Sequence, residues 1–101
     1  MVDNLKLLVK NKNTATIVGS FTVEHVNSIV SAGNEFIFQA DHPNFDLSEV
    51  TICDSSSVAR LIKWSSLTNN QNKQIRFSSI PNQMLAIMKV SGIDRLLESS
   101  L

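Results

Sequence analysis

Three consecutive serines follow an aspartate in the segment Asp54-Ser55-Ser56-Ser57, directly before an apolar helical pattern. Hydroxyl groups placed in this way can cap a helix, act as nucleophiles or accept a phosphate. Capping accounts for the residue types, because aspartate and serine side chains accept the backbone N–H groups that a first helical turn leaves unpaired. A phosphate would also be tolerated there, since the helix dipole favours negative charge at the N-terminus. The segment therefore stays open between a cap and a regulatory site.

A catalytic role for these serines lacks supporting residues. A nucleophile elbow needs the pattern Gly-x-Ser-x-Gly, and the segment contains no glycine. His25 is expected in a helix and His42 in a loop, and neither has a spacing that places it beside the serines as a base. One cysteine and two isolated histidines offer no metal-ligand cluster, and a Gly-rich phosphate loop is missing. We therefore expect no catalysis, no metal and no cofactor.

The charge balance and apolar content limit the class of protein. Nine basic and nine acidic residues give the 101-residue chain a formal net charge of zero. This balance argues against sequence-independent binding to nucleic acid, which needs a basic surface. No apolar run approaches the roughly 20 residues that span a bilayer, and a signal peptide is not apparent. The single cysteine, Cys53, suits a reducing compartment. We expect one cytoplasmic domain, residues 1–101, without membrane insertion.

The elements that must position the serines alternate between strand and helix patterns. Strands are expected at 5–9, 14–21, 44–52 and 74–80, with the first two forming a hairpin. Helices are expected from an N-cap at Thr22 to a stop at Gly33 and Asn34, and then at about 56–68, 81–90 and 91–100. Residues 35–44 show no clear pattern. The order predicts an α/β fold with a partly parallel sheet and an antiparallel edge.

The helix expected after the serines carries residues that could form a docking surface. Arg60 and Lys63 lie off its apolar stripe, as solvated charges or as partner contacts. Trp64 lies three residues after Leu61 and is either a core residue or an interface anchor, a role in which tryptophan is enriched. Elsewhere, the sulfur-containing side chains expected to be buried are Cys53, Met84 and Met88.

The run FDLSEVTICDSSSVARLIKW resembles the signature of STAS domains, in which a strand with Asp-Leu-Ser is followed by Asp-Ser/Thr and a helix. The segments ATIVGSFT and IRFSSIPNQMLAIMKVSGIDRLL are similar to other parts of this family, so the resemblance covers nearly the whole chain. It implies a STAS-like (SpoIIAA-like) α/β fold, with a mixed sheet of four to five strands and helices mainly on one face. It also implies a non-enzymatic domain that docks on another protein.

Two branches of the family imply different partners. In the small MlaB-like STAS subunits of Mla-type phospholipid-transport ABC systems, the hydroxyl residue directly after the aspartate, here Ser55, matters most. In anti-sigma-factor antagonists the second hydroxyl residue, here Ser56, is phosphorylated by a partner kinase, although Ser57 stands where that motif has glycine. The segments LIKWSSL and FSSIPNQMLAIMKVSGIDRLL look closer to the transporter branch.

The resemblance therefore implies a cytoplasmic subunit, peripheral to the inner membrane, that binds and stabilises or activates the ATPase of a bacterial lipid-transport complex maintaining outer-membrane lipid asymmetry. The alternative is an anti-sigma-factor antagonist that binds an anti-sigma-factor kinase and is phosphorylated at Ser56 or Ser55. The predicted partner-binding or regulatory residues are Asp54, Ser55, Ser56, Ser57, Arg60, Lys63 and Trp64.

Overall fold

The computed structural model of the chain describes residues 4–92, which contain a sheet with the strand order β1-β2-β3-β4. β1 (Lys6–Asn11) and β2 (Thr14–Phe21) form the predicted antiparallel hairpin. β3 (Asn44–Cys53) pairs with β2 in parallel, and β4 (Arg76–Ser78) pairs with β3 in parallel. The sheet is therefore mixed, as the alternation of strand and helix patterns predicts.

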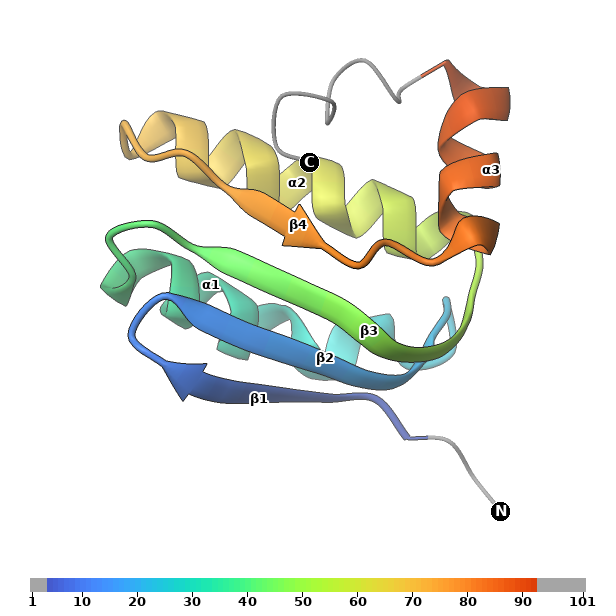
Figure 1. The fold of residues 1–101 in the computed structure, drawn as a ribbon, viewed down its shortest axis with the longest axis horizontal. Coiled ribbons are helices and arrows are strands. Elements are labelled where there is room, and N and C mark those ends of the chain that lie inside the picture. The colour runs from blue at the N-terminus through green and yellow to red at the C-terminus, as the bar shows by residue number, and fades with distance from the viewer. Residues whose placement is uncertain (1–3, 93–101) are drawn as a thin grey trace.

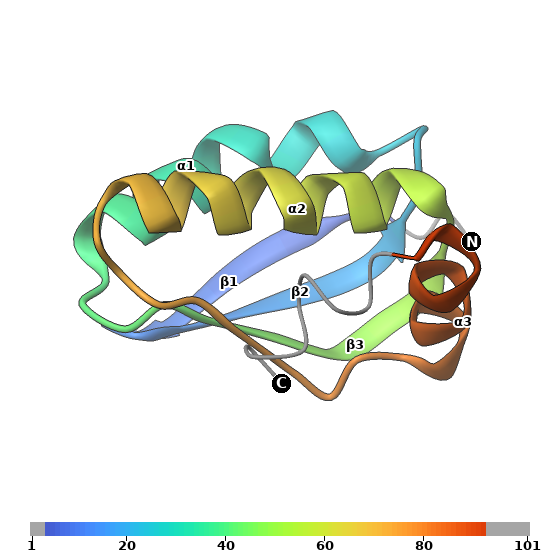
Figure 2. The same ribbon diagram turned by 90° about the horizontal axis from the view of Figure 1, so that it is seen from above.

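Helices cover one face of this sheet. α1 (Val30–Gln39) and α2 (Ser55–Asn70) lie side by side on that face, and no helix of residues 4–92 covers the other, open face (Figure 1 and Figure 2). A short 3-10 helix, η1 (Val26–Ile29), leads into α1. α3 (Asn82–Ser91) stands at the end of the molecule where α2 begins. This arrangement confirms the predicted fold class.

The core lies between the sheet and its helices and is centred on aromatic rings. Trp64 of α2 stacks on Phe45 of β3, with ring centroids 4.6 Å apart and an interplanar angle of 4°. Phe36 of α1 meets Phe45 edge-on at 5.2 Å, and Phe77 of β4 lies 6.0 Å from Phe45. Aromatic contacts of this kind add to the stability that burial provides. The predicted burial of the sulfur-containing residues is confirmed for Cys53, Met84 and Met88.

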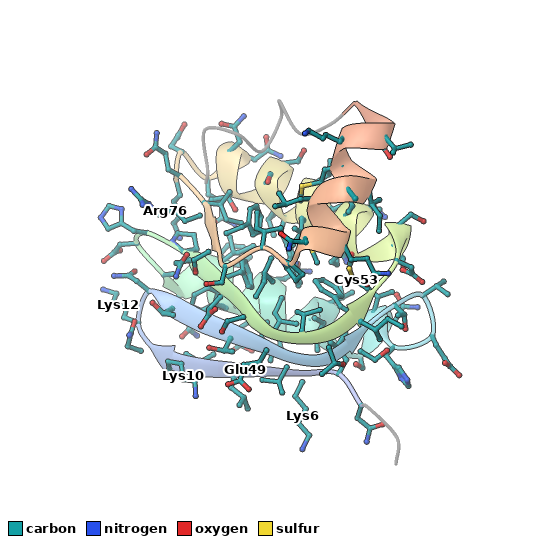
Figure 3. All side chains as sticks on the ribbon, turned by 45° about the vertical axis from the view of Figure 1, so that its right-hand side comes forward. Lys6, Lys10, Lys12, Glu49, Cys53 and Arg76 are labelled. Atoms are coloured by element: carbon teal, nitrogen blue, oxygen red, sulfur yellow. The ribbon has the colours of Figure 1, made fainter. Side chains whose placement is uncertain are left out.

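The open face of the sheet carries charges of both signs. Side chains alternate along a strand, so Leu5 is buried under the helices while Lys6 points the other way. Lys6 and Lys10 of β1 and Glu49 of β3 lie on this side (Figure 3). All three are exposed. This face is therefore mixed in charge.

The first helical region does not begin as predicted. The Thr22 hydroxyl caps no helix, because it pairs with the Ser20 hydroxyl at 3.2 Å. The carbonyl oxygen of Thr22 instead accepts the backbone N–H groups of His25 and Val26, at 3.0 and 2.8 Å, in a turn that precedes η1. The predicted N-cap at Thr22 is therefore wrong, and the turn takes the place of the first helical residues.

Gly33 does not end the first helix either, because it is a packing position inside α1. A Cβ atom at Gly33 would lie 2.2 Å from Cζ2 of Trp64. Glycine is thus the residue that lets α1 approach α2 while the indole ring stays stacked on Phe45. α1 continues to Gln39 and occupies part of the segment 35–44 that has no clear sequence pattern.

The later elements follow their predictions with shifted ends. α2 is longer than the predicted 56–68, and β4 is shorter than the predicted 74–80. Ser79, next to β4, has a φ of 56°, a left-handed conformation that does not continue a strand. α3 begins at Asn82, one residue later than the predicted 81–90, with Pro81 as its N-cap, and its C-cap is Gly92 with a φ of 70°. The helix expected at 91–100 lies, beyond residue 92, outside the described residues.

Candidate functional site

The serine segment lies at the junction between β3 and α2. Cys53 is the last residue of β3 and Ser55 is the first residue of α2, so Asp54 alone joins the two elements. Phe21, the last residue of β2, pairs with Cys53 across the parallel strands. The turn after β2 therefore lies beside the start of α2. This junction places a carboxylate, three hydroxyl groups and a second chain segment within reach of one another.

Asp54 is the N-cap of α2 and organises the junction. Its Oδ1 accepts the backbone N–H of Ser56 at 2.9 Å and also the Ser56 hydroxyl. Its Oδ2 accepts the backbone N–H of Val23 at 3.0 Å, from the turn 31 residues earlier. Its carbonyl oxygen accepts the Ser57 hydroxyl at 2.7 Å. One residue thus caps the helix and ties it to the turn after β2.

These hydrogen bonds set the ionisation of Asp54. Burial on its own raises the pKa of the carboxyl group. Hydrogen bonds from the Ser56 side chain and from the backbone N–H groups of Val23, Ser56 and Ser57 favour the carboxylate and bring the pKa below its ordinary value. Asp54 is therefore charged at neutral pH, and both of its carboxylate oxygens accept hydrogen bonds within the junction.

The three serines have different surroundings. Ser57 is fully buried. Ser56 is half-buried, and its hydroxyl donates to Asp54. Ser55 is exposed, and its hydroxyl makes no hydrogen bond to the described residues. Among these serines, Ser55 is the one whose hydroxyl is available to a partner in solution.

Among the described residues, no histidine ring is hydrogen-bonded to the three serines. His25 Nε2 lies 3.9 Å from Glu24 Oε2, and His42 precedes β3, whose far end carries the serines. Burial raises the pKa of the Cys53 thiol, which keeps it in its weakly nucleophilic protonated form. Over residues 4–92, no group of three or more His, Cys, Asp or Glu side chains is placed to hold a metal ion.

The predicted residues further along α2 divide into surface and core. Lys63 is exposed and Arg60 is half-buried. Trp64 has no exposed surface, and its indole N–H donates to Asn34 Oδ1 at 3.0 Å. Trp64 and Ser57 are therefore core residues that offer a partner no side-chain surface, which corrects the prediction that placed them in the docking surface. The accessible predicted residues form what we name the α2 surface: Asp54, Ser55, Ser56, Arg60 and Lys63.

Sequence reasoning missed two exposed apolar side chains at the same end of the molecule. Val23, whose N–H is bound by Asp54, is 70% exposed, and Ile52 is 49% exposed. Contiguous exposed apolar patches mark docking surfaces, whereas single exposed apolar side chains are common on protein surfaces. Alternation along β3 could have identified Ile52, since its neighbour Cys53 points into the core. Val23 gave no such signal, because the sequence pattern placed it on the apolar side of a helix.

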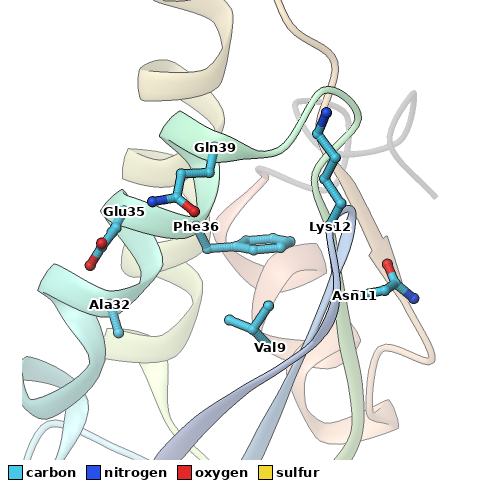
Figure 4. Close-up of a pocket in the computed structure, with 7 residues that line it drawn as sticks. All are labelled: Val9, Asn11, Lys12, Ala32, Glu35, Phe36 and Gln39. Atoms are coloured by element: carbon cyan, nitrogen blue, oxygen red, sulfur yellow. The ribbon is translucent and has the colours of Figure 1, made fainter.

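A groove of about 530 Å³ lies on another side of the molecule, between β1 and α1 (Figure 4). Its lining residues come from β1, α1 and the β1–β2 turn, and not from α2. Apolar side chains and a polar rim line it together: Val9, Ala32 and Phe36, with Asn11, Lys12, Glu35 and Gln39. None of these residues is a histidine, cysteine or serine.

Within residues 4–92, no helix combines the length and apolar character needed to cross a membrane.

Comparisons with known proteins agree with this architecture. A family model described as "Mlab, STAS domain" matches residues 9–98. The solved structure of the anti-sigma factor antagonist SpoIIAA in its unphosphorylated form is 15% identical with a TM-score of 0.68, over 90% of this chain and 83% of that chain. The Bacillus cell fate determinant SpoIIAA in the phosphorylated form is 16% identical with a TM-score of 0.67, over 90% and 86% of the two chains. No curated protein matches the chain significantly.

Proposed function

The chain belongs to the STAS domain family described as "Mlab, STAS domain", and on this premise we propose that it is a non-enzymatic subunit that binds the ATPase of a bacterial lipid-transport ABC complex. Binding would stabilise or activate the ATPase at the cytoplasmic side of the inner membrane and so help to maintain outer-membrane lipid asymmetry. STAS domains act through protein–protein interactions, and the α2 surface is the docking site that we assign to this interaction.

The observation that carries the proposal is the contrast between Ser55 and its neighbours. The hydroxyl of Ser56 is held by Asp54 and that of Ser57 is buried, whereas Ser55 is exposed and unpaired among the described residues. The transporter branch of the family is the one in which the hydroxyl residue directly after the aspartate matters most. The exposure of Ser55 therefore supports this branch.

The similarity in fold to SpoIIAA favours a second candidate, an anti-sigma-factor antagonist that a partner kinase phosphorylates at Ser56 or Ser55. A phosphate on Ser56 would remove the hydroxyl that donates to Asp54 and would place further negative charge beside that carboxylate. Ser55 has no such conflict. The geometry at Ser56 thus favours the transporter function over a switch at that residue.

Replacing Ser55 by aspartate tests the docking site. The helix dipole tolerates a negative charge at the first position of α2, so Ser55→Asp should change the free energy of unfolding by no more than about 1 kcal/mol. If the helix start docks on the ATPase subunit, the new charge must lose its water without a counter-charge, which weakens binding roughly a hundredfold. Thermal melts and calorimetric titration with the purified ATPase subunit measure the two effects.

Ser66→Asp is the matched control for this variant. Ser66 is exposed on the same helix, about three turns beyond Ser55, and its replacement should leave binding within about threefold of wild type. Ser56→Asp should have a milder effect on binding than Ser55→Asp. Full binding by folded Ser55→Asp would contradict docking at the start of α2. Capture of an anti-sigma-factor kinase, with Ser56→Asp the more damaging change, would establish the second candidate.

A further inference from the structure

The guanidinium group of Arg60 has no counter-charge in the described structure. Its Nε is buried and has no hydrogen-bond partner. No carboxylate of residues 4–92 lies within ion-pair distance of Arg60, and no other polar contact engages its terminal nitrogens. A guanidinium group stays charged in proteins, so this charge is partly desolvated without an anionic partner among the described residues. Such an arrangement is costly in the free chain and is relieved when an anion binds.

The side chain of Arg60 also rests on a rigid support. Its Cζ lies 5.3 Å from the ring centroid of Trp64, a distance at which the ring attracts the cation. The Trp64 ring is itself fixed, because it stacks on Phe45 and donates its N–H to Asn34. This contact favours one placement of the Arg60 side chain and so reduces the freedom that it loses on binding.

The surroundings of Arg60 select a negatively charged partner. α2 contains two basic residues, Arg60 and Lys63, and no acidic residue. The N-terminal end of the helix dipole adds positive potential on the same side. The adjacent carboxylate, Asp54, is already engaged by Val23 and Ser56 and does not reach Arg60. Arg60 lies one helical turn below Ser56, so its charge borders the helix start.

We propose that Arg60 is the charged anchor of the α2 surface and receives a carboxylate group from an acidic segment of the partner protein. The inference rests on the proposed function, because it specifies the chemistry of the partner at the same docking site. A carboxylate accepts two parallel N–H groups from a guanidinium group, a geometry that a lysine ammonium group does not match. The exposed side chain of Val23 adds apolar contact on the same end of the molecule.

The test compares three variants for binding to the purified ATPase subunit by calorimetric titration. Arg60→Gln removes the charge and should weaken binding about 30-fold to a hundredfold. Arg60→Lys keeps the charge but loses the two-pronged geometry, and should weaken binding about tenfold. Lys10→Gln removes an exposed charge on the open face of the sheet, outside the α2 surface, and serves as the matched control, with a change of about threefold or less. Thermal melts show which variants are folded.

A salt series on the wild-type protein keeps the inference testable if Arg60→Gln fails to fold, since this change also uncovers Trp64. Binding should weaken at least about threefold between about 50 and 300 mM salt, because a charge pair that remains partly exposed is screened by salt. An affinity independent of salt would overturn the inference. Equal binding by wild type and folded Arg60→Gln would also overturn it, while leaving the proposed function intact if Ser55→Asp still loses binding.

A phosphoserine within the chain is the competing anion. One outcome is that phosphorylation of Ser56 stabilises wild type but not Arg60→Gln, while both bind the ATPase subunit equally. Arg60 would then bind the phosphate within the chain, and the inference would be wrong. If the wild-type chain did not bind the ATPase subunit at all, the proposed function would fail and the inference with it. The outcomes therefore separate the two claims.

Discussion

The start and the middle of α2 differ in how they are held, although both lie on one continuous helix. At the start, Asp54 accepts hydrogen bonds from the backbone of Ser56 and Val23, while Ser55 and Val23 stay exposed. In the middle, Trp64 has no exposed surface and lies between Gly33 and the Phe45 ring. A hydrogen bond at a partly exposed site contributes about 1 kcal/mol, whereas removing a buried tryptophan costs about 3–5 kcal/mol.

Because of this difference, we expect substitutions in the two regions to have different effects. Substitutions of the buried residues in the middle of α2 should act on folding, and they should affect binding through the fraction of folded protein. Substitutions at the start should act on binding while the fold persists. A variant of Trp64 that abolished binding without loss of stability would contradict this division, and so would a variant of Ser55 that unfolded the chain.

The largest expected effect is that of Gly33→Ala. Alanine is the better helix former by about 1 kcal/mol, but its Cβ would lie 2.2 Å from Trp64 Cζ2 and must displace the ring. Overpacking of this kind costs about 1–3 kcal/mol, and because the ring also stacks on Phe45 we expect the upper end of this range. Chemical denaturation measures the loss. Ser31→Ala, at an exposed position of the same helix, should change stability by no more than about 0.5 kcal/mol.

A double variant identifies the cause of this loss. Trp64→Phe removes the indole atoms that the new Cβ would meet, so Gly33→Ala should cost about 1 kcal/mol or less in that background. An equal cost of Gly33→Ala in both backgrounds would mean that the ring contact is not responsible.

The same position shows why part of the fold could not be predicted from sequence. The hairpin, the β3–α2 junction and the helix after Pro81 are marked by residues within a few positions of the element that they define. Gly33 has its role through Trp64, which is 31 positions away, and a pattern read along the chain treats such a glycine as a helix stop. α1 was therefore predicted to end too early.

The candidate site, like the fold, could be predicted only where its signal lies within a few residues of the sequence. The order of Asp54 and the serines indicates a helix cap directly, and the structure has that cap. The bond from Val23 to Asp54 depends on β2 and β3 lying side by side, so local patterns give no sign of it. The burial of Trp64 could not be decided either, because its place at the edge of the apolar stripe fits both a core residue and an interface anchor.

A moderate loss of stability is expected from Asp54→Ala, which removes the contacts that hold the start of α2. The variant loses the N-cap and frees the turn at Val23, and the loss of a cap costs about 1–2 kcal/mol. Asp54→Asn should cost less, because asparagine is also a good N-cap. Urea denaturation of the two variants beside wild type measures these differences. Equal stability of Asp54→Ala and wild type would show that the junction is held by other contacts.

The smallest expected effect is a change of stability with pH that belongs to Asp54. Hydrogen bonds hold the pKa of Asp54 below its ordinary value of 3.8 in the folded chain, so the unfolded chain binds the proton more readily. The stabilisation from the carboxylate is therefore complete above about pH 5 and is lost as the pH falls through the folded pKa. Asp54→Asn has no proton to gain, so its deficit in unfolding free energy relative to wild type should shrink as the pH falls from 6 to 3. Asp41, whose pKa is lowered mainly by Lys12, loses stabilisation over the same range, but it is present in both proteins and cancels in the difference. Urea denaturation at each pH measures that difference, and a value independent of pH would mean that the charge of Asp54 does not stabilise the junction.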